Sequence, residues 1–182
     1  MIYYSIPWNT EKNIGVYYNQ MMKQVNDEDY VCFVDGDATF TTHYFGKQIE
    51  DIISKYKECE FFTCVTNRVG SVWQLSGDIH SDNIIEHREY GKYLFEKYYD
   101  CVTQIQDQVN ALSGVLILIS KKLWKDIGGF KENGMLGVDN DFYFRALSQN
   151  RIIYRMDGVY LYHWYRGGDM TRSIKSKIHL LK

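Results

Sequence analysis

Two aspartates separated by one glycine are the residues of this sequence best suited to chemistry. Asp35, Gly36 and Asp37 follow the apolar run Tyr30 to Val34 (YVCFV) directly. Two carboxylates this close repel each other, and a divalent cation relieves the repulsion. Mg²⁺ held by one or two carboxylates often completes its coordination shell with phosphate oxygens. The triplet therefore predicts a site for Mg²⁺ or Mn²⁺ that faces a phosphate-bearing ligand.

Two further Asp-x-Asp triplets occur, although about one is expected by chance in a chain of this composition. Asp27 and Asp29 lie in the hydrophilic segment NDED, and we expect them to be solvated. Asp139 and Asp141 stand at the start of a predicted helix, within GMLGVDNDFYFRAL. One of them is expected to cap the positive helix end. The other is a candidate general base, which needs a carboxylate held within reach of a substrate hydroxyl.

Basic and imidazole side chains stand where they could complete such a site. Arg145 lies one helical turn after Asp141 and is expected to pair with it. His163 ends the apolar segment VYLYH; such a lone histidine is more often structural, but neutral imidazole is also a good third ligand for Mn²⁺. Arg166 and Arg172, in the C-terminal segment, could clamp a diphosphate. An ordinary basic tail explains them equally well.

Strands and helices alternate along most of the chain, which predicts an α/β fold with a sheet flanked by crossover helices. The predicted strands are 2–6, 30–34, 61–66, 114–120, 152–155 and 159–163, and the predicted helices are a 12-residue helix capped by Asn9 or Asn13, 43–56, 89–99, 121–127 and 139–149. The polar segment from Arg68 to Val109 interrupts this order. Long segments of this kind inside a domain are often functional.

Composition restricts the class of protein. The length of 182 residues, with 45% hydrophobic and 24% charged residues, predicts one globular domain over 1–182. A net charge of -2 gives no positive field for nucleic acid. The longest apolar run, Val115 to Ile119, is far below the roughly 20 residues that span a bilayer. No basic, apolar leader begins the sequence, so a cytoplasmic location is expected, with peripheral attachment to a membrane left open. Four cysteines without metal-ligand spacing are expected to be structural thiols.

Several segments, in order, resemble family 2 glycosyltransferases of the GT-A fold. They are IPWN and NIGVYYN near the start, YVCFVDGDATF, LSGVLILISKKLWKDIGGFKE, GVDNDFYFRAL and the strand ending in His163. They cover most of residues 1–165, and GGFKE followed by GVDNDFYFR is the more specific part. The resemblance implies a GT-A-like mixed, mainly parallel sheet. It also implies a donor and metal side over 1–67, an acceptor side with the catalytic helix over 68–165, and a mobile tail over 166–182.

The resemblance also implies an activity: transfer of a sugar from a UDP- or GDP-linked donor to a hydroxyl of a carbohydrate or glycolipid acceptor, by an inverting single displacement. Asp35, Asp37 and His163 would hold Mn²⁺ or Mg²⁺, and Asp139 would be the catalytic base. Asp141 and Arg145 would support that base.

The sequence departs from the family at two places. Val138 stands where the family usually has Glu, and the chain reaches its first Asp-x-Asp strand with little sequence before it. Donor recognition would then depend on Pro7, Trp8 and Asn9, with Trp8 available for stacking, together with Gly36 and Arg166. These departures leave a non-catalytic nucleotide-sugar or carbohydrate-binding relative as one alternative. A nucleotidyltransferase is another, although IPWNTEKNIG is a poor match to the Gly-rich basic loop of that class.

Overall fold

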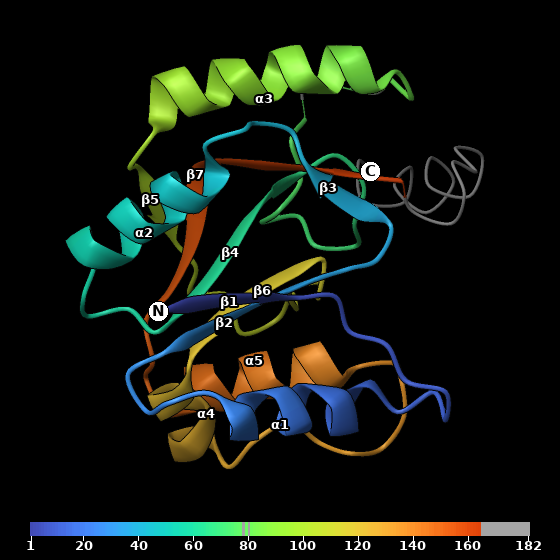
Figure 1. Ribbon diagram of the computed structural model, residues 1–182, viewed down its shortest axis with the longest axis vertical. Helices are drawn as coiled ribbons and strands as arrows, with labels where there is room; N and C mark the ends of the chain where they lie inside the picture. Colours follow the sequence, from blue (N-terminus) through green and yellow to red (C-terminus); the bar gives the residue numbers. More distant parts are fainter. Residues whose placement is uncertain (78, 80, 165–182) are drawn as a thin grey trace.

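The structure, a computed structural model, describes residues 1–77, 79 and 81–164, which form one seven-stranded mixed sheet between two layers of helices (Figure 1). Its elements are β1 (Ile2–Ser5), α1 (Ile14–Gln24), β2 (Tyr30–Val34), β3 (Ala38–Phe40), α2 (Phe45–Lys55), β4 (Phe61–Thr66), α3 (Ile84–Tyr98), β5 (Val102–Gln104), β6 (Leu116–Ser120), α4 (Lys121–Ile127), α5 (Val138–Ser148) and β7 (Ile153–His163). The α/β class predicted from the sequence is confirmed.

Each helical layer covers one apolar face of the sheet. Helices α1, α4 and α5 lie on one side, and α2 and α3 lie on the other (Figure 1). Successive residues of β2 point to opposite faces. Val31 and Phe33 join the core beneath α1, α4 and α5, whereas Cys32 and Val34 join the core beneath α2. The uninterrupted apolar run of β2 is therefore buried on both faces.

The sheet order is β1-β2-β6-β4-β7-β3, with β5 also paired to β7. The pairs β1–β2 and β4–β7 are parallel, whereas β2–β6, β4–β6, β3–β7 and β5–β7 are antiparallel. The expectation of a mixed sheet is confirmed, but the expectation of a mainly parallel one is wrong. The chain between β4 and β6 is not a single crossover helix. It contains α3, β5 and a loop that brings Val115 beside Asp35, at the end of β2. Strand β6 therefore starts where β2 ends and runs antiparallel to it.

Helices α1, α2, α4 and α5 lie near their predicted positions, whereas α3 begins at Ile84 rather than at about Glu89. The helix ends have local causes. Asn13 caps α1, and its side chain accepts the Val16 N–H at 3.4 Å. Helix α4 ends at Gly128, whose φ of 86° is left-handed. The residue before α5 is Gly137, also left-handed at φ 76°, so neither aspartate of the following triplet is the cap. The capping prediction is wrong in that detail.

The last strand corrects a second prediction. Instead of two short strands, β7 is one strand with an irregularity where Met156 and Tyr160 face adjacent residues of β4. Gly158 lies at this bend, where an added Cβ would stand 2.4 Å from the Tyr98 carbonyl oxygen. Glycine therefore allows the end of α3 to approach the sheet. The three-residue strands β3 and β5 were not predicted.

Two expectations from composition concern the cysteines and the membrane. Cys32, Cys59 and Cys64 are buried free thiols, and Cys101 is an exposed one. The burial of Cys32 and Cys64 agrees with their predicted structural role. Among the described helices, none combines the length and the apolar character needed to cross a membrane.

Candidate functional site

The turn after β2 and the pairing of β3 with β7 build the centre of the candidate site. The Asp35 N–H donates to the Val115 carbonyl at 3.2 Å, and the Ala38 N–H donates back to the Asp35 carbonyl at 3.0 Å. The register pairs Ala38 with His163, and the Trp164 N–H donates to the Asp37 carbonyl at 2.9 Å. Residues more than 120 positions apart in sequence thus meet at one sheet edge.

Asp35, Asp37 and His163 each offer one ligand atom, and these atoms all lie within 4.8 Å of one another. The His163 Nε2 atom is 3.1 Å from Asp37 Oδ1. Two neighbouring ligands of an octahedral Mg²⁺, each roughly 2.1 Å from the ion, are about 3.0 Å apart. The separation of these two atoms suits two ligands of one cation.

The orientation of His163 also suits a metal ligand. Its Nδ1 atom lies 2.6 Å from the Arg68 carbonyl oxygen, which only accepts, so Nδ1 carries the proton. Its backbone N–H donates to Asn67 Oδ1 at 2.8 Å. In the neutral imidazole, Nε2 then directs its lone pair toward the Asp37 carboxylate. A second-sphere carbonyl that fixes the tautomer in this way is typical of metal-bound histidine. The donor set therefore fits a divalent cation.

Asp35 is in an unfavourable place for a bare carboxylate. Burial raises its pKa, the positive charge that His163 carries when protonated acts to lower it, and the negative charges of Asp37 and Asp139 raise it further. The net direction is upward. A bound cation would reverse this balance by stabilising the ionised form.

Asp139 lies in the first turn of α5 and faces the same space. It lines a cavity of about 300 Å³ together with Asp35, Asp37 and Tyr18, here called the acidic cleft; its remaining lining residues are Pro7, Ile14, Gly36, Ser113, Gly114, Met135 and Val138. The Asp139 carboxylate accepts the Gly114 N–H at 2.7 Å and the Asn140 N–H at 2.9 Å. Burial raises its pKa, and these backbone hydrogen bonds partly offset the effect. Such a group is held in place and is a stronger base than an ordinary carboxylate.

Asp141 has a different role, although it lies two residues further along the same helix. Arg145 donates through Nε at 2.7 Å to Asp141, and Lys131 forms a second ion pair with it. Arg145 also donates to the carbonyls of Ile127 and Gly129, at 2.7 Å each. Burial acts to raise the Asp141 pKa, but the bonds from Lys131 and Arg145 lower it. The predicted pair of Asp141 and Arg145 is present, and it ties α5 to the end of α4.

The predicted donor-binding residues at the start of the chain are not all in the cleft. Pro7 lines it, but Trp8 is 72% exposed and is not among the lining residues. Asn9 uses its side-chain oxygen to accept the N–H groups of Glu11 and Asn13, at 2.8 and 3.1 Å. Arg166 lies outside the described residues, and Val138 is buried in the core.

Three functional candidates were missed from the sequence. Asn67 positions His163 and directly follows the buried strand β4, a place that could have marked it. Gln74 is fully buried and holds Ser113 by two hydrogen bonds, 2.7 Å to its N–H and 3.0 Å to its carbonyl, which places the adjacent Gly114. Tyr18 lines the acidic cleft near both Asp35 and Asp139. Nothing in the local pattern distinguishes Gln74 or Tyr18 from structural residues.

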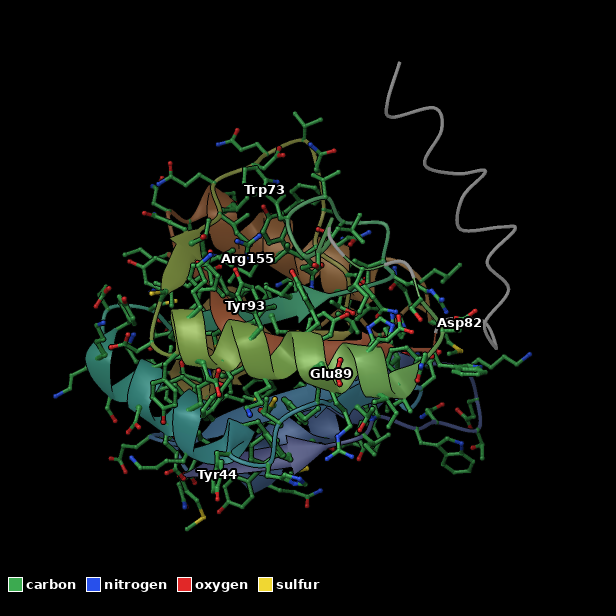
Figure 2. All side chains as sticks on the ribbon, turned by 90° about the horizontal axis from the view of Figure 1, so that it is seen from above. Tyr44, Trp73, Asp82, Glu89, Tyr93 and Arg155 are labelled. Carbon is green, nitrogen blue, oxygen red and sulfur yellow. The ribbon has the colours of Figure 1, made fainter. Side chains whose placement is uncertain are left out.

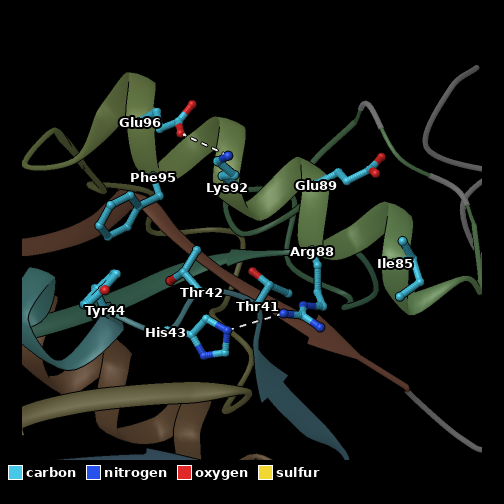
Figure 3. A pocket seen from close by; sticks show the side chains of 10 residues that line it. All are labelled: Thr41, Thr42, His43, Tyr44, Ile85, Arg88, Glu89, Lys92, Phe95 and Glu96. Atoms are coloured by element: carbon cyan, nitrogen blue, oxygen red, sulfur yellow. Dashed lines mark hydrogen bonds and ion pairs between the residues drawn. The ribbon is translucent and has the colours of Figure 1, made fainter.

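A larger hollow of about 500 Å³ lies elsewhere, between α3 and the segment before α2. We call it the α3 groove; it is lined by Thr41, Thr42, His43, Tyr44, Ile85, Arg88, Glu89, Lys92, Phe95 and Glu96 (Figure 3). Helix α3 crosses the sheet with Glu89 and Tyr93 on view in Figure 2. Its charged side chains pair with neighbours, as in Lys92 with Glu96 at 3.7 Å and Arg88 with His43 at 3.4 Å. None of the predicted site residues that the structure describes lines this groove.

Comparison of the sequence with protein-family models and with curated proteins found no match.

Proposed function

We propose that this chain is a metal-dependent glycosyltransferase that moves a sugar from a nucleotide-diphosphate donor to an acceptor hydroxyl. The observation that carries the proposal is the meeting of Asp35 and Asp37 with the held carboxylate of Asp139 in one cleft, while His163, next to Asp37, completes a divalent-metal ligand set with the first two. Metal ligands beside a lone base suit a reaction with an anionic leaving group and a hydroxyl nucleophile.

The fold supports the proposal at the level of architecture. The acidic triplet follows a strand buried on both faces, and ligands of open α/β sheets bind beyond the carboxyl ends of such strands. The mixed sheet, the triplet after β2 and the histidine ending β7 are the arrangement expected of a GT-A-like domain. We propose that fold family for this chain.

The proposed metal ligands and the proposed base have separate tasks in this reaction. When bound by Asp35, Asp37 and His163, Mg²⁺ or Mn²⁺ would neutralise charge on the diphosphate that leaves. The bond between the anomeric carbon and the diphosphate oxygen breaks, and its electron pair leaves with the diphosphate. The acceptor oxygen forms the new bond to the anomeric carbon, and its proton passes to the Asp139 carboxylate. Gly114 and Asn140 hold that carboxylate in place through their N–H groups.

The donor and acceptor classes remain part of the proposal. A UDP- or GDP-linked sugar is the proposed donor, and a carbohydrate or glycolipid hydroxyl is the proposed acceptor. Pro7 lines the acidic cleft and would contact the donor there. Tyr18 lines the same cleft and interacts electrostatically with both Asp35 and Asp139.

A donor-hydrolysis assay tests the proposal. UDP-, GDP-, CMP- and dTDP-linked sugars are incubated with the protein, with and without Mn²⁺, and the released nucleotide is measured. Mn²⁺-dependent release from one donor, lost in Asp37→Ala, is the expected result. Pyrophosphate release from a nucleoside triphosphate and a sugar phosphate would instead indicate a nucleotidyltransferase. Binding without release would indicate a non-catalytic relative, and no binding to any donor would contradict the proposal.

A further inference from the structure

Asp139 lines a second hollow as well as the acidic cleft. This second hollow, here called the Ser71 hollow, has a volume of about 450 Å³. Ser113, Met135 and Asp139 line both spaces. A hydroxyl bound in the Ser71 hollow and a group bound at the metal side therefore approach the same carboxylate. The volume suits a small ligand rather than solvent alone.

The unpaired hydroxyl of Ser71 indicates that the ligand of this hollow is polar. Ser71 is only 3% exposed, and its Oγ atom has no hydrogen-bond partner among the described residues. Buried hydroxyls nearly always have a partner, because an unpaired one loses its hydration without compensation. Ser71 lines the hollow, so a rotation of its side chain about χ1 would present the hydroxyl to a ligand hydroxyl there, which would supply the missing partner. Asn110 and Asn140 add amide groups to the same lining.

The rim of the hollow is apolar and exposed. Met135 is 54% exposed and Leu136 is 93% exposed, and both line the hollow. They lie in a loop between Gly134 and Gly137, whose left-handed φ values of 118° and 76° shape its path. Exposed apolar side chains beside a polar hollow indicate contact with an apolar part of a ligand.

The charge of the lining restricts the ligand further. No lysine or arginine lines the Ser71 hollow in the part of the chain that the structure describes, and Asp139 is its one charged residue there. A phosphate group would be repelled by that carboxylate and would find no cation to pair with. The lining therefore disfavours an anionic ligand.

We infer that the Ser71 hollow binds the acceptor, and that the acceptor is a neutral amphiphilic glycoside, an inference that rests on the proposed glycosyl transfer. Its sugar hydroxyls face Ser71 and Asp139, and its apolar aglycone lies on Met135 and Leu136. A free sugar lacks the apolar part, and a phosphorylated lipid carries the wrong charge.

Matched pairs of small glycosides test the inference. Methyl and phenyl β-glycosides of glucose, galactose and N-acetylglucosamine are titrated into the wild-type protein, and binding is followed by saturation-transfer NMR. We expect at least one phenyl glycoside to bind, about tenfold more tightly than its methyl counterpart because the ring buries apolar surface. Leu136→Ser should reduce that preference to about twofold.

A blocking variant locates the site. At Gly70, which lines the hollow, an added Cβ would meet nothing within 4 Å, so Gly70→Tyr is expected to fold and to fill the space. It should abolish binding of both glycosides. Gly77→Tyr is the matched control, because Gly77 is equally unhindered but lines a different pocket. Should Gly70→Tyr fail to fold, Leu136→Ser decides the question, since that side chain is almost fully exposed.

The outcomes separate this inference from the proposed function. Binding of UDP and GDP with Mn²⁺ is measured on the same samples by calorimetry. Nucleotide binding with no glycoside binding, unchanged affinity in Gly70→Tyr, or an unchanged phenyl preference in Leu136→Ser would overturn the acceptor inference alone. Glycoside binding that the block removes, with no nucleotide binding, would support the hollow as a glycoside site and contradict glycosyl transfer.

Discussion

The acidic cleft and the α3 groove are both hollows, but they differ in the surroundings of their charged side chains. In the α3 groove, Lys92 pairs with Glu96, and both side chains are largely exposed. Arg88 contacts His43 in the same groove. In the acidic cleft, Asp35 and Asp139 are carboxylates whose pKa values are raised mainly by burial. The acidic cleft, the smaller of the two, therefore contains carboxylates whose ionised form is destabilised by burial.

This difference indicates that the α3 groove results from packing, whereas the acidic cleft is suited to bind a ligand. A groove between a helix and a loop forms wherever side chains do not fill the space, and its surface charges pair locally. Carboxylates gathered in a buried cleft destabilise the empty site, and a ligand or cation must compensate. Substitutions in the acidic cleft should thus change function, whereas substitutions in the α3 groove should not.

The largest effect is expected from Asp139→Asn. The amide cannot accept a proton from the acceptor hydroxyl, so turnover should fall by roughly 100-fold or more, the usual scale for loss of a general base. Binding of a nucleoside diphosphate with Mn²⁺ should be unchanged, as measured by calorimetry. Glu89→Gln in the α3 groove is the control and should keep full turnover. Equal turnover in the two variants would remove the distinction between the two hollows.

Gln74→Ala is expected to have the next largest effect. Gln74 holds Ser113, and the adjacent Gly114 holds Asp139, so turnover should fall about tenfold because the base is less well positioned. Stability should fall by about 2 kcal/mol from the buried groups left unpaired. Gln48→Ala removes another fully buried glutamine, on α2, which donates to the Tyr99 carbonyl. It should cost similar stability in urea unfolding with unchanged turnover.

Asp141→Asn should affect stability more than activity. It weakens the contacts of Asp141 with Arg145 and Lys131 that tie α5 to its neighbours, at a cost of about 2 kcal/mol. Turnover, measured at a temperature where the variant is folded, should stay within about threefold of wild type. If Asp141→Asn lost activity and Asp139→Asn kept it, the assignment of the base would be reversed.

The smallest expected effect concerns His87, a fully buried residue that joins α3 to the sheet through the Tyr160 hydroxyl at 2.7 Å. Burial lowers its pKa below the ordinary 6.5, so the unfolded chain takes up the proton first as the pH falls. Stability is then lost as the pH falls below about 6.5 toward the lowered value. Urea unfolding at pH 7.5 and 5.5 should show a smaller pH dependence in His87→Gln. An equal dependence in both proteins would show that His87 does not contribute.

Periodicity predicted the elements well where the apolar pattern was long. Strands β2 and β4 and helix α4 have the predicted bounds, because a continuous apolar run or a stopping glycine marks both ends. Strand direction was not predicted correctly, since an apolar run carries no record of which way its neighbour runs. The three-residue strands β3 and β5 were too short to show any period.

The candidate site was predicted only in part for a similar reason. The aspartate triplets and His163 are visible as motifs, but the contact of His163 with Asp37 depends on the register of β3 and β7. Asp29 was expected to be solvated, yet it is 5% exposed and accepts the N–H of Asn26 at 3.0 Å. Positioning by Gln74 and Asn67 is set by tertiary contacts between distant segments, which no local pattern records.

The most direct test of the central claim is pulsed electron paramagnetic resonance of the protein loaded with one equivalent of Mn²⁺. If Asp35, Asp37 and His163 hold the ion, the wild-type spectrum shows coupling to a directly bound imidazole nitrogen. This coupling disappears in His163→Gln and stays in His43→Gln, the matched histidine of the α3 groove. Wild-type protein that binds Mn²⁺ without nitrogen coupling, or coupling that survives in His163→Gln, would contradict the assignment.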